Sequence, residues 1–148
     1  IASNIVRRRE KDRITTCGEL AAIVEESIPL KFRSPACARQ TFQAIRIEVN
    51  GELTGLRECI KGLVRHLNTG GRICILTFHS LEDRIVKETF RELQTPCTCP
   101  PQFPVCVCGK KKEVELVNKK PIVASAEEMQ ENSRSKCAKL RIACKIEA

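Results

Sequence analysis

The segment over residues 70–87 constrains the fold of this chain most strongly, because it reads as a strand, a tight turn and a helix in direct succession. Its sequence is Gly-Gly-Arg-Ile-Cys-Ile-Leu-Thr-Phe-His-Ser-Leu-Glu-Asp-Arg-Ile-Val-Lys. A glycine pair opens a short apolar run over residues 72–78, which is typical of a buried parallel strand. Ser80 stands where a helix over residues 80–94 would begin, and together with Asp83 it predicts a capping-box-like start. We therefore expect a strand–helix unit of an α/β sheet.

Two polar residues, His79 and Ser80, fall at the carboxyl end of this predicted strand. Ligands of open α/β sheets bind just outside the carboxyl ends of the strands, so the pair is a candidate site. The alternative for His79 is a histidine whose ring satisfies backbone groups at the strand end. Glu82 and Asp83 are better explained as capping and first-turn helix charges. Arg84 either binds phosphate or forms a salt bridge.

Two further stretches support a family assignment. Residues 41–53 read Thr-Phe-Gln-Ala-Ile-Arg-Ile-Glu-Val-Asn-Gly-Glu-Leu, and residues 131–142 read Glu-Asn-Ser-Arg-Ser-Lys-Cys-Ala-Lys-Leu-Arg-Ile. Together with the segment over 70–87, they resemble the RsmH/MraW family of bacterial methyltransferases, which act on N4 of a cytidine in 16S ribosomal RNA. The resemblance extends from the first residue to the C-terminus.

The resemblance implies an α/β fold, namely the C-terminal part of a class I (Rossmann-like) methyltransferase sheet. That sheet is doubly wound and mostly parallel, with one antiparallel edge strand. Residues 1–40 would be part of a helical insertion, a substrate-recognition subdomain. Residues 41–148 would form the C-terminal part of the methyltransferase domain, with a small Cys-rich loop over 97–109. The half of the family that binds S-adenosylmethionine, with its Gly-rich loop, would lie upstream of Ile1.

The same resemblance implies S-adenosylmethionine-dependent N4-methylation of a cytidine, carried by the full-length protein and absent from the isolated chain. His79 and Ser80 would line the pocket for the target base as catalytic residues, and no residue of this chain is assigned to cofactor binding. The implied partners are 16S ribosomal RNA or the small ribosomal subunit, and either a second copy or the missing N-terminal half. The alternative function is a non-catalytic, basic, zinc-binding RNA-binding module.

The net charge of +8 favours a polyanionic partner, although a merely basic, soluble surface is the alternative. Arg46 and Asn50 lie four residues apart and therefore share a helix face, which either contacts RNA or is simply solvated. Arg84, Arg134 and Lys136 complete the predicted RNA contacts, which would neutralise phosphates without reading sequence. Stacking of bases on an aromatic platform is not expected, since the chain has no Trp, no Tyr and only five Phe.

Four of the ten cysteines form two C-x-C pairs separated by six residues: Cys97 and Cys99, then Cys106 and Cys108. Residues two apart in extended backbone point to the same side, so each pair can present two thiolates to one ion. Four thiolates suit a structural zinc ion, and also the iron of a rubredoxin-like centre. Disulfides and reduced thiols are the alternatives. The other six cysteines occur singly and are expected to be small buried hydrophobic residues in a reducing compartment.

The remaining pattern predicts a long helix over residues 41–67, in which apolar residues recur at spacings of three and four. Gly51, Gly55 and Gly62 weaken this helix and can kink or split it. Three shorter elements are expected over residues 113–117, 126–131 and 139–146. No apolar run is long enough for a membrane span and the start is too polar for a signal peptide, so the expected location is cytoplasmic.

Overall fold

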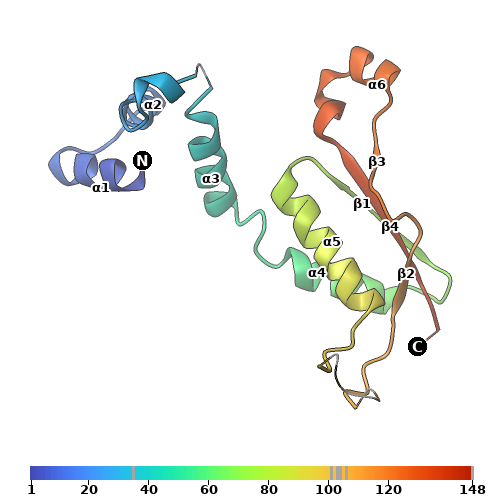
Figure 1. The fold of residues 1–148 in the computed structure, drawn as a ribbon. Coiled ribbons are helices and arrows are strands. Elements are labelled where there is room, and N and C mark those ends of the chain that lie inside the picture. Colours follow the sequence, from blue (N-terminus) through green and yellow to red (C-terminus); the bar gives the residue numbers. More distant parts are fainter. Residues whose placement is uncertain (35, 101, 103–104, 106, 148) are drawn as a thin grey trace. The chain divides into compact units, whose positions relative to one another are not determined.

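The structure is a computed structural model that describes residues 1–34, 36–100, 102, 105 and 107–147. The chain divides into two units, Ile1–Glu52 and Leu53–Ala148 (Figure 1). The boundary expected from the sequence, after residue 40, lies twelve residues before this division and inside the helix Arg39–Asn50. The assignment of the two parts to a substrate-recognition and a methyltransferase subdomain stays a prediction.

The first unit is helical. Its elements are α1 (Ala2–Lys11), α2 (Cys17–Glu26), the 3₁₀ turn η1 (Leu30–Phe32) and α3 (Arg39–Asn50). A capping box starts α2: the Thr16 hydroxyl accepts a hydrogen bond from the backbone N–H of Glu19, and the Glu19 carboxylate accepts one from the backbone N–H of Thr16. Among the described residues of this unit, the buried hydrophobic side chains are Ile23 and Val24. Its core is therefore small.

The second unit is a sheet with helices on one face (Figure 1). Its elements are α4 (Leu56–His66), β1 (Arg72–Thr77), α5 (Ser80–Gln94), β2 (Val114–Leu116), β3 (Ile122–Val123), α6 (Ala126–Glu131), η2 (Ser133–Cys137) and β4 (Lys139–Lys145). The strand order is β1-β4-β2, and β3 pairs with the other end of β4. The main core joins α4 and α5 to the sheet and comprises Ile60, Val64, Ile73, Val86, Phe90, Leu93, Val114 and Ala143.

The pairing register separates the two faces of this sheet. Ile73 pairs with Ala143 on the face that α4 and α5 cover, and both residues are buried. The next pair, Cys74 with Ile142, lies on the opposite face, because successive residues of a strand alternate sides. On that face Leu76 remains 54% exposed. The sheet therefore buries one apolar face under α4 and α5 and leaves much of the other exposed, and we call this second face the uncovered face.

The predicted long helix over residues 41–67 is instead two helices. Gly51 has φ 61° at the end of α3, and Gly55 has φ 77° at the start of α4. Both values lie in the left-handed region, which glycine adopts without the steric cost of a Cβ atom. The helix is therefore split at Gly51 and Gly55, which is one of the two outcomes that the sequence left open for these glycines.

Two expectations about the strands need correction. β1 was expected to be parallel to its neighbour, but in the described structure it pairs antiparallel with β4. The antiparallel strand, β4, lies between β1 and β2 rather than at an edge. Since β1 and β2 both run opposite to β4, they run parallel to each other. The helix over 80–94 and the short helix over 126–131 are confirmed, and the last strand ends one residue earlier than expected.

The expectation that the single cysteines are buried is wrong for Cys17, Cys59, Cys74 and Cys137, which are exposed. The physical reason is visible for Cys74, which points to the uncovered sheet face. Among the described residues, no helix has both the length and the apolar character needed to cross a lipid bilayer.

Candidate functional site

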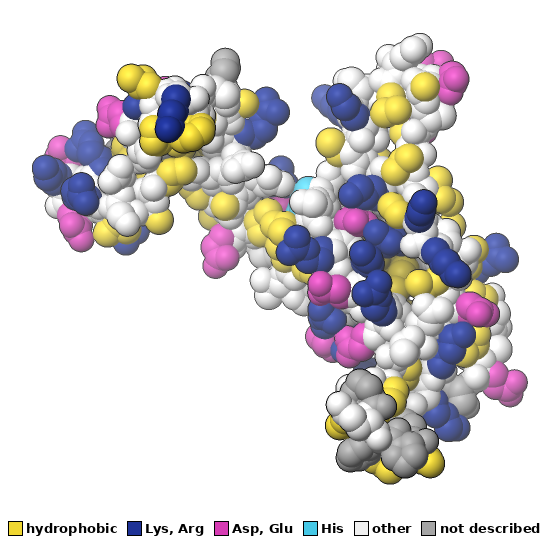
Figure 2. Space-filling view, viewed as in Figure 1, with side chains coloured by type: hydrophobic (Ala, Val, Ile, Leu, Met, Phe, Trp, Pro, Cys, Tyr) yellow, Lys and Arg dark blue, Asp and Glu magenta, His cyan; other side chains and the backbone are white. Residues whose placement is uncertain are grey.

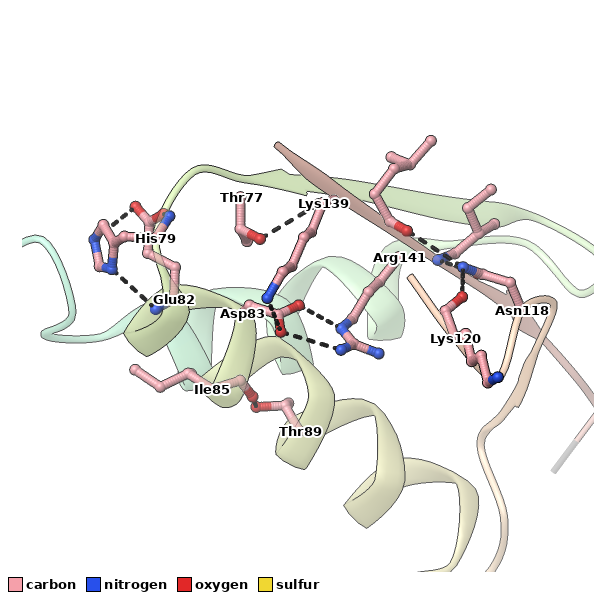
Figure 3. Close-up of polar contacts among 12 residues, drawn as sticks. Thr77, His79, Glu82, Asp83, Ile85, Thr89, Asn118, Lys120, Lys139 and Arg141 are labelled. Atoms are coloured by element: carbon pink, nitrogen blue, oxygen red, sulfur yellow. Dashed lines mark hydrogen bonds and ion pairs between the residues drawn. The ribbon is translucent and has the colours of Figure 1, made fainter. Parts of the chain in front are cut away.

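The carboxyl end of β1 leads into α5 through a capping box built on His79. The ring Nδ1 of His79 accepts a hydrogen bond from the backbone N–H of Glu82 at 3.3 Å. The Glu82 carboxylate in turn accepts bonds from the backbone N–H groups of Phe78 at 3.0 Å and His79 at 3.3 Å. Figure 3 shows how His79 and Glu82 face each other. The predicted N-cap was Ser80 with Asp83, and this is wrong by one position. His79 is the last extended residue, with φ −136° and ψ 161°, so its ring faces the helix start.

The same contacts define what His79 can do. Its Nε2 lies 3.4 Å from a carboxylate oxygen of Glu82, and its side chain is only 11% exposed. Both ring nitrogens therefore face the first turn of α5, as the alternative sequence interpretation held. Ser80 is the first helical residue and is exposed. The catalytic roles of His79 and Ser80 stay predictions.

A buried ion pair ties α5 to β4. The Arg141 guanidinium donates hydrogen bonds from Nε and Nη2 to the two carboxylate oxygens of Asp83, at 2.6 and 3.1 Å. Lys139 Nζ lies 3.5 Å from the same carboxylate (Figure 3). The hydrogen bonds from Arg141 hold the pKa of Asp83 below its usual value, against the opposing effect of burial. Sequence reasoning treated Asp83 as a first-turn charge and missed this pair.

Asn118 fixes β4 on both sides of Arg141. Its side-chain oxygen accepts a hydrogen bond from the backbone N–H of Ile142 at 2.8 Å, and its side-chain nitrogen donates to the carbonyl oxygen of Leu140 at 3.2 Å. The same nitrogen donates to the carbonyl of Lys120 at 2.7 Å. β2 pairs with one end of β4 and β3 with the other end. The Asn118 side chain supplies hydrogen bonds to the part of β4 that lies between them (Figure 3).

A hollow of about 320 Å³ lies on the uncovered face at the carboxyl end of β1, and we call it the sheet hollow. Its apolar lining includes Leu76, Phe78 and Leu140, and its polar lining includes Asn132 and Arg134. The predicted RNA contact Arg134 thus lies beside the strand end that carries His79. Lys136, on the same turn η2, is exposed but is not among the residues that line the hollow.

Arg84 belongs to a basic stripe along α5, made of Arg84, Lys87 and Arg91. All three side chains are exposed, and their spacings of three and four residues place them on one helix face. Lys87 and Arg91 line a small hollow of about 50 Å³ together with Lys119. Figure 2 shows Lys and Arg side chains gathered over this side of the second unit. Sequence reasoning named Arg84 alone, although the spacing of the other two was a readable signal.

The other predicted RNA contacts, Arg46 and Asn50, lie in the first unit. They share a helix face, as their spacing indicates, and both hydrogen-bond to the carboxylate of Glu52. The guanidinium of Arg46 donates from Nε at 2.8 Å and from Nη2 at 3.0 Å, and Asn50 donates at 3.0 Å. The Glu52 carboxylate offsets the positive charge of Arg46, so this face attracts phosphate less than the sequence suggests.

Three of the four predicted metal ligands come together. The Sγ atoms of Cys97, Cys99 and Cys108 all lie within 4.8 Å of one another. The fourth predicted ligand, Cys106, lies outside the described residues.

Comparison with known proteins identifies the family. The profile of the MraW methylase family matches residues 1–146. The chain belongs to the MraW methylase family.

Two curated relatives agree with this family membership. The chain is 55% identical over 147 residues to "Ribosomal RNA small subunit methyltransferase H" of Clostridium botulinum (strain Hall), which covers 99% of the chain and 48% of the relative. It is 54% identical over 144 residues to "Ribosomal RNA small subunit methyltransferase H 2" of Agathobacter rectalis, and the matched region covers 96% of the chain and 46% of the relative. The chain spans about half the length of these relatives.

The glycine pair of this MraW family chain does not fit a cofactor loop. Such a loop follows a strand and keeps its backbone N–H groups available for the ligand, whereas Gly70 and Gly71 precede β1. The N–H of Gly70 donates to the carbonyl of Lys145, and the N–H of Gly71 donates to the carbonyl of Asn68, both at 2.8 Å. A Cβ atom on Gly71 would lie 2.8 Å from that Asn68 oxygen. The two glycines are therefore needed for the turn into β1, and they do not form a site for S-adenosylmethionine.

Proposed function

We propose that this chain is the C-terminal part of an S-adenosylmethionine-dependent methyltransferase that modifies N4 of a cytidine in 16S ribosomal RNA in the cytoplasm. The observation that carries the proposal is the identity of 54–55% over nearly the whole chain to relatives named as ribosomal RNA small subunit methyltransferases. The basic stripe on α5 supports an RNA substrate, since exposed Lys and Arg side chains neutralise phosphates.

On this proposal the second unit contributes to recognition of the substrate. Arg84, Lys87 and Arg91 contact the RNA backbone. The sheet hollow, with an apolar lining and Arg134 at its polar side, receives a base that has left its stack. Exposed Lys136 adds a further phosphate contact.

The proposed catalytic contribution of this chain is positioning of the target base. His79 and Ser80 directly follow Phe78, which lines the sheet hollow, so they stand at the same strand end as the place that a base would occupy, although the His79 ring faces α5. Methyl transfer to the exocyclic amine needs little from such residues. A hydrogen-bond acceptor that orients the amine is sufficient, together with at most a weak base. The buried Asp83–Arg141 pair holds the start of α5, and with it His79, against β4.

We further propose that the cofactor is bound by the part of the relatives that this chain does not span, and that the isolated chain is inactive. That remaining part, rather than a second copy of this chain, is the proposed partner of the uncovered sheet face beside the sheet hollow, so that the hollow itself stays open for the base. Its length supports this, since the match covers only 46–48% of the relatives. β1 also stands at the edge of the described sheet, where a further strand can pair.

The test is methyl transfer by the full-length protein that contains this chain. Small ribosomal subunits or 16S ribosomal RNA are incubated with methyl-labelled S-adenosylmethionine, digested to nucleosides and analysed by mass spectrometry. The expected product is N4-methylcytidine, and a label on another atom or base would overturn the assignment. Tight RNA binding without methyl transfer would instead support the non-catalytic, zinc-binding RNA-binding module.

The role of His79 is tested separately with His79→Asn in the same full-length protein. Asparagine is a good N-cap, so this variant should keep its melting temperature while kcat falls, if His79 acts on the target base. An unchanged kcat would leave His79 with a capping role alone. Ser80→Ala is the parallel variant, since Ser80 does not cap α5.

A further inference from the structure

The connection between α5 and β2 is long, and a backbone-to-backbone hydrogen bond among its described residues lies at its base. Residues 95–113 contain no helix or strand in their described part. The backbone N–H of Glu113 donates to the carbonyl of Leu93 at 2.9 Å, which closes the base of the loop. Val105 and Val107 are 70% and 73% exposed, so these apolar side chains do not tether it to the core. A loop of this kind needs another source of order.

The thiols of Cys97, Cys99 and Cys108 provide a means of ordering this loop. Cys97 and Cys99 stand on the outgoing arm of the loop, and Cys108 stands on the returning arm. Their sulfur atoms lie within 4.8 Å of one another. Sulfur atoms around a tetrahedral zinc ion are about 3.8 Å apart, given Zn–S bonds of about 2.3 Å. Shifts of about one ångström or less would therefore bring all three to ligand positions.

The backbone around the cluster also suits a metal thiolate. The N–H of Val107 donates to the Sγ atom of Cys99 at 3.4 Å and so joins the two arms. Hydrogen bonds of this kind orient ligands and stabilise their negative charge. Gly109, directly after Cys108, has φ 64°, which lets the chain turn away from the cluster without steric cost.

Positive charge lies close to the cluster. Lys110 and Lys111 line a hollow of about 420 Å³ together with Cys97, and the acidic residues that line it include Glu92, which pairs with Lys61 at 2.9 Å. A zinc ion with three or four thiolates carries a net negative charge, which Lys110 and Lys111, close to Cys108 in the chain, would partly offset. In return, a fixed loop would hold Lys110 and Lys111 in place at this hollow.

We propose that Cys97, Cys99 and Cys108 bind a structural Zn²⁺ ion that closes the loop between α5 and β2. The sequence predicts Cys106, which lies outside the described residues, as the fourth ligand. Each ligating thiol releases its proton to solvent, and the zinc stays divalent. With Cys106 as the fourth ligand, the ion would have no open position for a substrate, so its role would be structural. The inference does not rest on the proposed methyl transfer.

The first test is the metal content of the 148-residue chain, produced without a polyhistidine tag and purified in the presence of a phosphine reductant. Mass spectrometric elemental analysis should find about one zinc per chain. Replacement by Co²⁺ should give the thiolate-to-cobalt charge-transfer bands of a tetrahedral sulfur site. A chain that holds no metal, or holds iron instead, would overturn the assignment of zinc.

Matched variants locate the site. Cys99→Ser should lose the zinc, whereas Cys137→Ser should keep it, because Cys137 is exposed on η2 away from the loop. Far-ultraviolet circular dichroism checks that both variants still fold. Equal zinc in the two variants would contradict the site, and full retention in Cys106→Ser would remove Cys106 as the fourth ligand.

Alkylation of the unaltered chain tests the same proposal without any variant. Cys97 is exposed, as are Cys59 and Cys74, so burial alone predicts similar reactivity for the three. With zinc bound, Cys97, Cys99 and Cys108 should be protected from iodoacetamide, and a zinc chelator should remove that protection. Equal reactivity before and after chelation would contradict the proposal. Protection that only a reductant removes would indicate a disulfide instead.

Discussion

Asp83 shows how one side chain can hold the end of a strand and the start of a helix together. Its carboxylate is 11% exposed and the Arg141 side chain is 10% exposed, so neither charge is screened well by water. In such a pair the cost of burying two charges offsets much of their attraction. The strong effect is expected when one partner is removed, because the other charge stays buried.

We expect Asp83→Asn to lower the free energy of unfolding of the second unit by about 3 kcal/mol, because Arg141 would remain buried without its carboxylate. The matched control is Glu115→Gln, which breaks the exposed pair with Lys112 and should cost about 0.5 kcal/mol or less. Urea unfolding followed by circular dichroism measures both. Equal costs would show that the Asp83–Arg141 pair is not a buried contact.

The same pair predicts an acid dependence of stability. The pKa of Asp83 is lowered in the folded chain, chiefly by the hydrogen bonds from Arg141. The contribution of the Asp83 charge to the free energy of unfolding is therefore complete above the pKa of the unfolded chain, about 3.9. It is lost as the pH falls through the lower pKa of the folded chain. The difference in unfolding free energy between the wild type and Asp83→Asn should be constant above about pH 5 and shrink in more acid solution. A difference that grows toward low pH would contradict this sign.

At the scale of elements, glycines set the boundaries of α3 and α4. Gly55 has φ 77° at the start of α4, whereas Gly62 lies inside that helix. A Cβ atom at either position would meet nothing within 4 Å, so backbone conformation alone decides the effect of a substitution.

We expect a Gly→Ala substitution to change the free energy of unfolding in opposite directions at these two positions. Gly62→Ala should raise the free energy of unfolding by about 0.5–1 kcal/mol, because alanine favours a helix interior. Gly55→Ala should lower it by about 1 kcal/mol, because alanine is strained at positive φ. Urea unfolding midpoints of the two variants provide the measurement. A stabilising Gly55→Ala would mean that α4 continues through this position.

Local signals predicted much of the element pattern. The residues of α5 and α6 follow from apolar spacing and flanking turn residues, and both helices lie where the pattern placed them. The N-cap was misplaced because a histidine ring accepts the bond that serine usually accepts. The Asp83–Arg141 pair could be inferred only in part. The burial of Asp83 was readable, because it lies three residues before Val86 and seven before Phe90, on the buried face of α5. Its partner was not, because Arg141 is 58 residues away. Pairing across such a separation depends on the fold and is not contained in a local pattern.

At the scale of the whole molecule, the uncovered sheet face is the feature that most needs a partner. Leu76 and Phe78 are 54% and 55% exposed, and both line the sheet hollow. A sheet with one bare apolar face and an edge strand promotes association with other chains.

The isolated chain should therefore self-associate as its concentration rises, and Leu76→Lys should reduce this association. Leu63→Lys is the matched control, because Leu63 is 53% exposed but lies on α4. Light scattering after size-exclusion chromatography gives the mass of each variant. Equal association of the two variants would show that the sheet face is not the surface involved.

The central proposal is that this chain contributes to substrate recognition in a methyltransferase whose cofactor is bound by the part of the relatives that the chain does not span. Isothermal titration calorimetry of the purified 148-residue chain with S-adenosylmethionine tests it most directly. No binding heat is predicted for the isolated chain, while the full-length protein that contains it should bind. Micromolar binding to the isolated chain would contradict the account, because the residues that it contains would then be sufficient to form the cofactor site.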